Sequence, residues 1–251
     1  MTGLLAVAVR AARAGAAVLR DAGPVTVQRH KSSPTDPVTA VDLAAEAAIV
    51  AVLTAARPGD AILGEEGAAR PGHTGLRWVI DPVDGTTNLL YGDPHVTVSV
   101  ACERDGRTVA GVVVDPARSE TFTATLGGGA FRNGTPLRVN DPVPLPQALV
   151  ATGFAYHPDD RRRQAATAAA LLGDIRDLRS HGSAALELCW LAAGRCDGYY
   201  EDRLAPWDFA AGALIAAEAG ATVTPLGTGV LAAGPALHHL LLERIHVPVP
   251  C

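Results

Sequence analysis

The sequence has few cysteines, and no two of them have the spacing of a metal or redox motif. Its four cysteines, Cys102, Cys189, Cys196 and Cys251, form no C-x-x-C pair. A structural zinc site is therefore not expected, because such sites commonly take two ligands from closely spaced cysteines. Cys189 and Cys196 are seven residues apart, which suits two core positions of one helix. We expect free, buried thiols and a cytoplasmic protein.

Blocks of positive charge and long apolar runs are also missing. The 251 residues carry a net charge of −5, and the arginine run at 161–163 is short enough to be a solvated face. The apolar N-terminal stretch is interrupted by Arg10, Arg13 and Arg20, so it fits an amphipathic helix better than a signal peptide. No other stretch has the length of a membrane span. We therefore expect neither nucleic acid nor a membrane as a partner.

The order of the predicted elements changes along the chain. Helical periodicity predicts helices over 3–22 and 42–57. Strand-like segments with turn signals follow from residue 95 to residue 139, which predicts an antiparallel meander. The Gly- and Pro-containing stretch 67–75, which precedes them, is expected to be a mobile loop.

A proline-rich segment at 140–146 separates the meander from a different pattern. Beyond it, strand-like and helical segments alternate up to about residue 245, which indicates α/β organisation. We expect a single domain over 1–251, with one lobe over 1–140 around the antiparallel sheet and an α/β lobe over 147–251.

The segment from Trp78 to Asn88, with the sequence WVIDPVDGTTN, has the clearest chemical pattern. Asp81 and Asp84 follow an apolar run, and a carboxylate pair at a strand end suits hard divalent cations, which prefer oxygen ligands. The glycine and two threonines that follow can open a helix and offer backbone N–H groups to an anion. An ordinary turn is the simpler alternative, because Asp-Pro and Asp-Gly pairs are common turn formers.

Three further acidic residues lie in contexts that suit a site. Glu65 follows a short apolar segment, Asp208 lies at a predicted helix start, and Asp42 begins another helix. Each residue alone could be a solvated carboxylate, a helix-start residue or an N-cap. A metal site is favoured only because five such positions occur in one chain.

Four ordered elements of the sequence resemble the signature motifs of the inositol monophosphatase family, whose members are magnesium-dependent and lithium-sensitive. These elements are KSSPTDPVTAVD at 31–42, GEE at 64–66, WVIDPVDGTTN at 78–88 and WDFAAGALIAAEAG at 207–220. The resemblance implies a layered α-β-α-β-α sandwich of the inositol monophosphatase and fructose-1,6-bisphosphatase type. It also implies a homodimer and inhibition by lithium.

The resemblance further implies roles for individual residues. Two or three Mg²⁺ ions would be held by Glu65, Asp81, the carbonyl of Val83, Asp84 and Asp208. Asp42 and Thr86, together with Glu65, would orient and activate the attacking water. Lys31 lies on a loop that either covers the site or is solvated. The implied substrate contacts are Asp84, Gly85, Thr86, Ser183, Ala184, Glu201 and Asp208.

The physical requirements of phosphate ester hydrolysis agree with this set. A phosphate monoester carries nearly two negative charges, and bound Mg²⁺ can neutralise them and lower the pKa of bound water. Carboxylates and one carbonyl satisfy a cation that prefers octahedral oxygen ligands. No serine or cysteine nucleophile and no histidine base is needed. Only His181, beside a predicted site loop, is a candidate for contact with substrate.

We therefore expect hydrolysis of a small phosphate monoester, with inositol 1-phosphate as the first hypothesis. Thr87-Asn88 and Glu201 resemble the inositol enzymes, whereas Ser183 replaces their threonine. Histidinol phosphate, fructose 1,6-bisphosphate and 3′-phosphoadenosine 5′-phosphate remain alternatives, because the metal residues do not distinguish them. A catalytically silent relative that binds a phosphate ligand or a protein partner is the alternative of another class.

Overall fold

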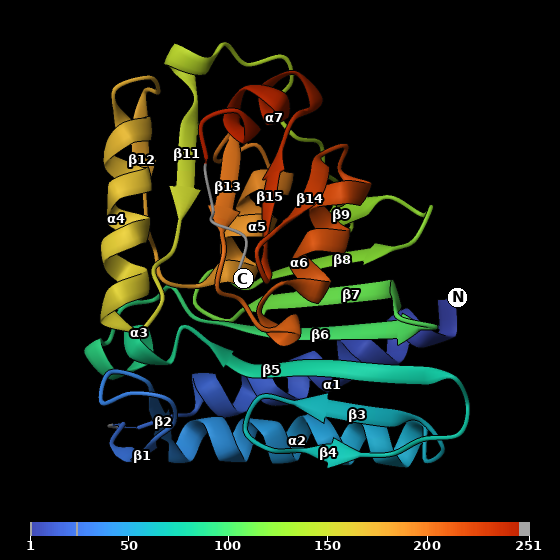
Figure 1. Ribbon diagram of the computed structural model, residues 1–251. Coiled ribbons are helices and arrows are strands. Elements are labelled where there is room, and N and C mark those ends of the chain that lie inside the picture. The colour runs from blue at the N-terminus through green and yellow to red at the C-terminus, as the bar shows by residue number, and fades with distance from the viewer. Residues whose placement is uncertain (1, 24, 246–251) are drawn as a thin grey trace.

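Two alanine-rich helices form the first layer of the molecule. The computed structural model describes residues 2–23 and 25–245, and helices α1 (Thr2–Arg20) and α2 (Ala40–Ala56) cover one face of a large sheet (Figure 1). Small side chains allow this close packing, because a Cβ atom at Gly15 would lie 2.9 Å from the Ile49 side chain of α2. The fully buried alanines of α1 are Ala8, Ala11, Ala12 and Ala16.

The large sheet has eight strands in the order β10-β9-β8-β7-β6-β5-β3-β4. Its neighbouring strands are antiparallel except for β3 and β5, which confirms the predicted meander. Asp105-Gly106 and Asn133-Gly134 have positive φ angles, as two-residue hairpin turns require. The strands are β3 (Ala61–Gly64), β4 (Ala69–Arg70), β5 (Leu76–Asp84), β6 (Thr97–Arg104), β7 (Arg107–Asp115), β8 (Glu120–Thr125), β9 (Ala130–Arg132) and β10 (Thr135–Pro136).

A second sheet has five strands in the order β12-β11-β13-β15-β14. Strands β12, β11 and β13 are parallel, whereas β15 and β14 are antiparallel to their neighbours. The strands are β11 (Leu149–Thr152), β12 (Asp177–Arg179), β13 (Gly198–Glu201), β14 (Thr222–Leu226) and β15 (Gly229–Ala233), and a 3-10 turn, η1 (Leu145–Gln147), precedes them.

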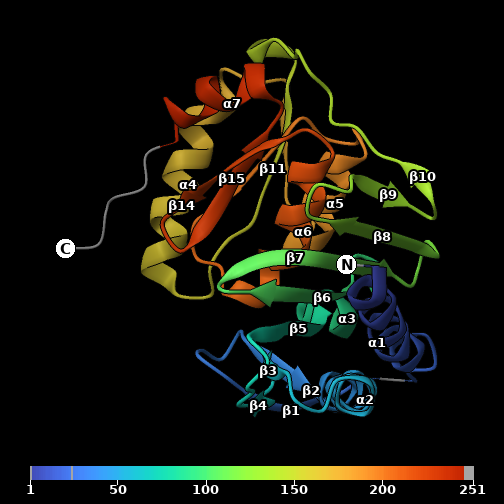
Figure 2. The ribbon, with the colours of Figure 1, turned by 90° about the vertical axis from the view of Figure 1, so that its right-hand side faces the viewer.

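Helices α5 (Ala184–Ala192) and α6 (Pro206–Glu218) lie between the two sheets. Helices α4 (Pro158–Leu172) and α7 (Pro235–Leu242) cover the outer face of the five-stranded sheet (Figure 2). The contact between α6 and the large sheet is close, because a Cβ atom at Gly111 of β7 would lie 2.9 Å from the carbonyl oxygen of Ala211. This arrangement confirms the expected α-β-α-β-α layers.

Two segments differ from the sequence-based expectation. Residues 37–39, for which the sequence predicts no strand, form β2 (Pro37–Thr39), which pairs with β1 (Val27–His30). The stretch 67–75 contains β4, which pairs with β3, and the Arg70 guanidinium anchors it by donating to the carbonyl of Asp60. Both pairings depend on contacts that a local pattern does not contain.

Other expectations concern the cysteines and the membrane. Cys102, Cys189 and Cys196 are buried free thiols, as predicted, whereas Cys251 lies outside the described residues. Within the described part of the chain, no helix combines the length and the apolar character that crossing a bilayer requires.

Candidate active site

A β-bulge at the end of β5 places two carboxylates on one face of the large sheet. Asp81 pairs with Ser99 and Asp84 pairs with Thr97, so three steps along β5 match two steps along β6. Side chains three residues apart on a regular strand point to opposite faces. The extra residue restores the same face for both aspartates, and proline is tolerated at such a bulge. The Asp-Pro-Val-Asp sequence thus turns both side chains toward the second half of the chain.

Glu65, Asp81 and Asp208 converge from three different elements. Glu65 follows β3, Asp81 ends the regular part of β5, Asp208 lies in the first turn of α6, and one carboxylate oxygen of each lies within 4.8 Å of the others. Burial, and then the charge of Glu65, raises the pKa values of Asp81 and Asp208 well above their ordinary range. Three carboxylates in this position repel one another, and a cation would relieve that repulsion.

The donor set fits a hard divalent cation. Glu65 Oε2 is buried and has no hydrogen-bond partner in the described part of the chain, so an acidic oxygen is left for a ligand. The Val83 carbonyl also lies at the cavity, where it is 3.0 Å from the Thr86 hydroxyl. Oxygen ligands without sulfur or imidazole suit Mg²⁺ or Mn²⁺.

Asp84 is not a member of this three-carboxylate group. Its Oδ2 accepts hydrogen bonds from Ser183 Oγ at 2.6 Å and from the Ala185 N–H at 2.8 Å. Burial raises the pKa of Asp84 to about 6, although these hydrogen bonds oppose the shift. Ser183 is the N-cap of α5, and its hydroxyl is directed at Asp84, so it ties α5 to the bulge. Ser183 and Ala184 both line the cavity.

Asp42 and Thr86 form a buried pair beside the carboxylate group. The Thr86 hydroxyl donates to Asp42 Oδ1 at 2.7 Å, and the backbone N–H of Thr39 donates to Asp42 Oδ2 at 3.0 Å. Asp42 belongs to a capping box at the start of α2 and has no exposed surface. Thr86 lines the cavity, whereas Asp42 does not. Asp42 can therefore act on a ligand only through the Thr86 hydroxyl.

The start of the short helix α3 (Thr86–Tyr91) faces the same cavity. Its N-cap, Gly85, has a φ of 101°, and a Cβ atom there would lie 2.7 Å from the carbonyl oxygen of His95. Only glycine fits this position. The N–H groups of the first turn lack intrahelical partners, so they can bind an anion.

Lys31 lies at the carboxylate group rather than in open solvent. Its ammonium donates to Glu65 Oε1 at 2.8 Å and also contacts Glu66. Burial lowers the pKa of Lys31, but attraction to Glu65 and Glu66 outweighs this effect and raises it overall. Lys31 also lines the cavity, so its charge is available to an anionic ligand.

A buried carboxylate of α2 holds the turn that carries Glu65. Glu46 accepts the backbone N–H groups of Glu66 and Ala68, each at 2.9 Å. A Cβ atom at Gly64 would overlap the Glu46 carboxylate, so the glycine gives this side chain its room. Glu46 does not line the cavity and therefore positions Glu65 through the backbone.

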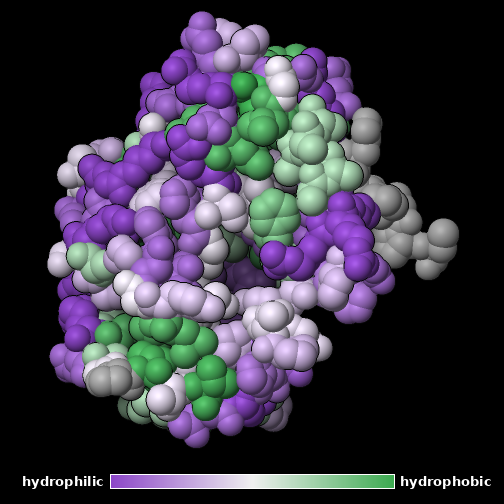
Figure 3. Space-filling view, turned by 90° about the vertical axis from the view of Figure 1, so that its left-hand side faces the viewer, coloured by the Kyte–Doolittle hydropathy of each residue, from purple (hydrophilic) through white to green (hydrophobic). Residues whose placement is uncertain are grey.

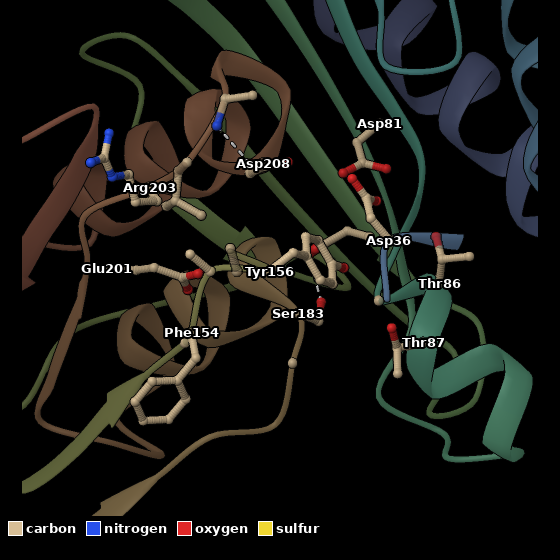
Figure 4. A pocket seen from close by; sticks show the side chains of 18 of the residues that line it. Asp36, Asp81, Thr86, Thr87, Phe154, Tyr156, Ser183, Glu201, Arg203 and Asp208 are labelled. Atoms are coloured by element: carbon tan, nitrogen blue, oxygen red, sulfur yellow. Dashed lines mark hydrogen bonds between the residues drawn. The ribbon is translucent and has the colours of Figure 1, made fainter. Parts of the chain in front are cut away.

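These residues surround a cavity of about 700 Å³. A hollow opens on the face of the molecule that Figure 3 shows. In the close view, Asp81, Thr86 and Thr87 lie on one side of the cavity, and Glu201 and Arg203 lie on the other (Figure 4).

Glu201 lies at the end of β13 on this second side. Its Oε2 accepts a hydrogen bond from the Tyr199 hydroxyl at 2.7 Å. Burial raises the pKa of Glu201 to about 7, while the Tyr199 hydrogen bond opposes the shift. Gly153 leaves space for the carboxylate, which would overlap a Cβ atom there.

Sequence reasoning missed several residues on this side. Phe154, Tyr156, Arg161 and Arg203 line the cavity, but none of them belongs to a motif. No signal in the sequence could have selected them. The candidate contact His181 does not line the cavity: its ring is bound to Glu187, and its carbonyl accepts a hydrogen bond from Asn88. Residues 67–75 are also absent from the cavity wall.

Comparison with known proteins agrees with the motifs. The sequence profile of the inositol monophosphatase family matches residues 1–246. The chain belongs to the inositol monophosphatase family. Family membership identifies it as an enzyme, a phosphoric monoester hydrolase.

Relatives in this family include proteins with two kinds of name. The "Inositol-1-monophosphatase SuhB" of Mycobacterium tuberculosis is 46% identical over 86% of this chain and 80% of its own length. The "Nus factor SuhB" of Pseudomonas aeruginosa is 42% identical over 98% of this chain and 91% of its own. The crystal structure of the suppressor protein suhB from Bartonella henselae superposes with a TM-score of 0.90 at 35% identity, covering 99% of this chain and all of that one.

Proposed function

We propose that this member of the inositol monophosphatase family hydrolyses a small phosphate monoester with the help of Mg²⁺, and that inositol 1-phosphate is a substrate. The convergence of Glu65, Asp81 and Asp208 beside the Thr86–Asp42 pair carries the proposal. These groups offer a cation site and a water-orienting hydroxyl within one cavity. The name of the mycobacterial relative supports the choice of ester.

Glu65, Asp81 and Asp208 would hold the metal, with the Val83 carbonyl and Asp84 nearby for a second or third ion. Bound Mg²⁺ supplies positive charge to the phosphate and lowers the pKa of bound water. The raised pKa values of Asp81 and Asp208 support this assignment, since a bound cation would favour the ionised form that burial and the charge of Glu65 oppose.

Thr86 would orient the attacking water. Its hydroxyl proton points to Asp42, so the lone pairs of its oxygen can accept a hydrogen bond from water. As the water oxygen bonds to phosphorus and the ester P–O bond breaks, a water proton can pass to the Thr86 hydroxyl while the hydroxyl's own proton moves to Asp42, and the leaving alkoxide takes a proton from solvent. Asp42 is thus a positioning and proton-holding residue.

The phosphate would lie against the start of α3. Gly85, Thr86 and Thr87 line the cavity where the N–H groups of the first turn lack intrahelical partners, and Lys31 adds a positive charge at the same end. Glu201 lies across the cavity, where it can accept hydrogen bonds from hydroxyl groups of a polyol. This separation keeps the Glu201 charge away from the phosphate dianion (Figure 4).

A phosphate-release assay on purified protein tests the proposal. We expect release from inositol 1-phosphate with Mg²⁺, none after chelation, and little with Ca²⁺, whose looser coordination shell suits this chemistry poorly. Histidinol phosphate and 3′-phosphoadenosine 5′-phosphate serve as alternative esters in the same assay. Release from none of these esters at saturating Mg²⁺ would reject the proposal and favour a non-catalytic binding role.

Three finer properties belong to the same proposal. Lithium should inhibit in a pattern that is not competitive with substrate, because it would replace a metal after hydrolysis. A homodimer is expected, and its mass can be measured in solution. The Nus factor name belongs to the Pseudomonas relative; for this chain, a net charge of −5 argues against direct nucleic-acid binding.

A further inference from the structure

A buried glutamine of α4 joins two segments of the cavity wall. Gln164 is 6% exposed and shares the buried face of the helix with Ala168 and Leu171. Its Oε1 accepts the backbone N–H of Ala155 at 2.8 Å, and its Nε2 donates to Asp202 Oδ1 at 2.6 Å. These partners fix the orientation of the amide, because the N–H requires an oxygen acceptor and the carboxylate requires an N–H donor. Both ends of one buried amide are therefore used, on two different segments.

The first segment follows β11 and covers part of the cavity. Phe154 and Tyr156, the neighbours of Ala155, both line the cavity, and Tyr156 projects toward its middle (Figure 4). The Ala155 carbonyl accepts a hydrogen bond from Arg161 Nη1 at 3.2 Å. Since Gln164 takes the N–H of the same residue, α4 holds both polar backbone groups of Ala155.

The second segment follows β13 and is held by α4 in the same manner. Glu201 and Arg203, the neighbours of Asp202, both line the cavity. Asp202 itself is 5% exposed, and its carboxylate contacts Arg163 of α4 in addition to Gln164. In each segment, α4 therefore binds a residue whose two neighbours face the cavity.

The bridge lies beyond the point where the sheet itself sets the spacing of the two segments. Strands β11 and β13 are parallel neighbours, and their last paired residues are Thr152 and Tyr200. Ala155 and Asp202 both come after this pair, so the Gln164 amide sets the separation of the segments there. Gln164 does not line the cavity. It can act on a ligand only through the two segments that it joins.

We propose that Gln164 is a positioning residue that determines specificity, because it shapes the cavity wall that receives the alcohol part of the substrate. The inference rests on the proposed function, in which Glu201 contacts that part. Without the bridge, the Ala155 N–H and one Asp202 oxygen lose a partner, and the two segments are free to separate. Side chains on such segments need a supporting contact to keep a fixed arrangement. The alcohol part of the ester would then bind less tightly.

The replacement Gln164→Leu removes both hydrogen bonds at nearly constant size. We would measure kcat and KM for inositol 1-phosphate and for p-nitrophenyl phosphate, which offers no hydroxyl group to Glu201. KM for inositol 1-phosphate should rise by about 10-fold with kcat little changed, and KM for p-nitrophenyl phosphate should rise by less than about 2-fold. Calorimetric Mg²⁺ affinity should be unchanged, because the Asp208 carboxylate is held separately by the Ala205 N–H at 2.7 Å.

Two further variants separate positioning from general stability. Gln164→Glu keeps an acceptor for the Ala155 N–H but places a carboxylate against Asp202. It should therefore raise the same KM, and it serves as the test if Gln164→Leu does not fold. His238→Leu is the control, because His238 is 5% exposed on α7, over the same sheet, and its Nε2 lies 2.9 Å from Thr224 Oγ1, outside the cavity wall. This control should lower the free energy of unfolding and leave both KM values unchanged.

Equal changes of KM for both esters in the Gln164 variants, or no change for either ester, would overturn the inference while leaving the proposed function intact. A loss of Mg²⁺ affinity as large as the rise in KM would also overturn it, since the bridge would then support the metal site. The same rise of KM in His238→Leu would overturn it by assigning the effect to general stability. Failure of the wild type to hydrolyse either ester would instead reject the proposed function.

Discussion

The two ends of the cavity differ in how the chain builds them. At the carboxylate end, Asp81 and Asp84 are directed by a bulge, Asp208 by a helix start and Gly85 by a left-handed backbone conformation. At the arginine end, Arg161 and Arg203 project from a helix surface and a strand-following loop. The first end is set by backbone geometry, whereas the second is set by side chains that can change without refolding the backbone.

We expect the carboxylate end to determine the rate of hydrolysis and the arginine end to determine which ester is preferred. The carboxylate end collects like charges in a buried place, which costs stability unless a cation is bound. At the arginine end, Arg163 and Arg203 both contact Asp160, and Arg163 also contacts Asp202. Removal of a carboxylate at the first end should therefore lower turnover strongly and raise the stability of the metal-free protein. Substitutions at the second end should instead shift the preference among esters.

The largest effect is expected for Asp81→Asn. Asparagine keeps the oxygen that accepts the Val83 N–H at 3.0 Å, but it removes the charge from the three-carboxylate group. Loss of that metal ligand should lower kcat by at least about 100-fold, which corresponds to roughly 3 kcal/mol of barrier. Phosphate release at saturating Mg²⁺ measures the effect. A variant that retains a tenth or more of wild-type turnover would show that Asp81 does not hold a metal.

The next largest effect is expected from Glu46, whose carboxylate holds the turn that carries Glu65. Glu46→Gln should replace one acceptor of the turn by a donor, leaving either the Glu66 or the Ala68 N–H unpaired. We expect Mg²⁺ affinity to weaken by about 10-fold, with a smaller loss of kcat at saturating metal. Calorimetric titration with Mg²⁺ gives the affinity.

Glu218→Gln is the matched control for that experiment. Glu218 also accepts two backbone N–H groups, those of Gly127 and Gly129, but it does not line the cavity. Its substitution should lower the free energy of unfolding without changing Mg²⁺ affinity. The same loss of affinity in both variants would mean that Glu46 acts through general stability.

A smaller effect is expected at the arginine end from Tyr199→Phe. The Tyr199 hydrogen bond lowers the pKa of Glu201, which burial otherwise raises, so its loss should raise that pKa further above about 7. At pH 7, kcat/KM for inositol 1-phosphate should fall by a few-fold, and it should recover at higher pH. The pH profile of kcat/KM measures this shift.

Tyr200→Phe and Glu201→Gln are the two control variants for the pH profile. The Tyr200 hydroxyl is buried and has no hydrogen-bond partner among residues 2–23 and 25–245, so its removal should leave the profile unchanged. Glu201→Gln should lower kcat/KM for inositol 1-phosphate by about 10-fold at every pH, and p-nitrophenyl phosphate should be affected less. An unshifted profile in Tyr199→Phe would show that Glu201 does not contact the polyol in its charged form.

The smallest effect is on the stability of the metal-free protein. Burial raises the folded-state pKa of Asp84 to about 6 and raises that of Asp81 well above its ordinary value, compared with about 3.9 for both in an unfolded chain. Between these values the folded state holds more protons than the unfolded state, so these groups lower stability as pH rises. In EDTA, the Tm of Asp81→Asn should exceed that of wild type by a few degrees at pH 7 and by less at pH 5.

Differential scanning calorimetry of the two proteins over this pH range measures that difference. Added Mg²⁺ should stabilise wild type more than the variant. A Tm difference that shrinks as pH rises would contradict the assigned pKa directions.

The sequence predicted the meander from local patterns, whereas the layers and the roles of the acidic residues were implied by its resemblance to the family. Alternating polarity and Asp-Gly or Asn-Gly turns mark the meander, and Asp81, Gly85 and Asp208 belong to recognisable motifs. It could not predict that β5 contains a bulge, nor that Glu46 reaches the turn after β3, because these features depend on pairing between distant segments.

Arg161 shows the same limit at the other end of the cavity. The run at 161–163 looks uniform in the sequence, yet only Arg161 reaches the cavity once α4 packs against the five-stranded sheet. A position on a helix surface acquires a role from its neighbours in space. Tyr156 and Arg203 escaped prediction for the same reason.

The central claim is that Glu65, Asp81 and Asp208 form a site for a divalent cation. Anomalous diffraction from crystals soaked in Mn²⁺, which accepts the same oxygen ligands as Mg²⁺, tests it most directly. The account predicts an anomalous peak between the carboxylates of these three residues, and no peak there in Asp81→Asn crystals. Wild-type crystals that show no peak among Glu65, Asp81 and Asp208 at saturating Mn²⁺ would contradict it.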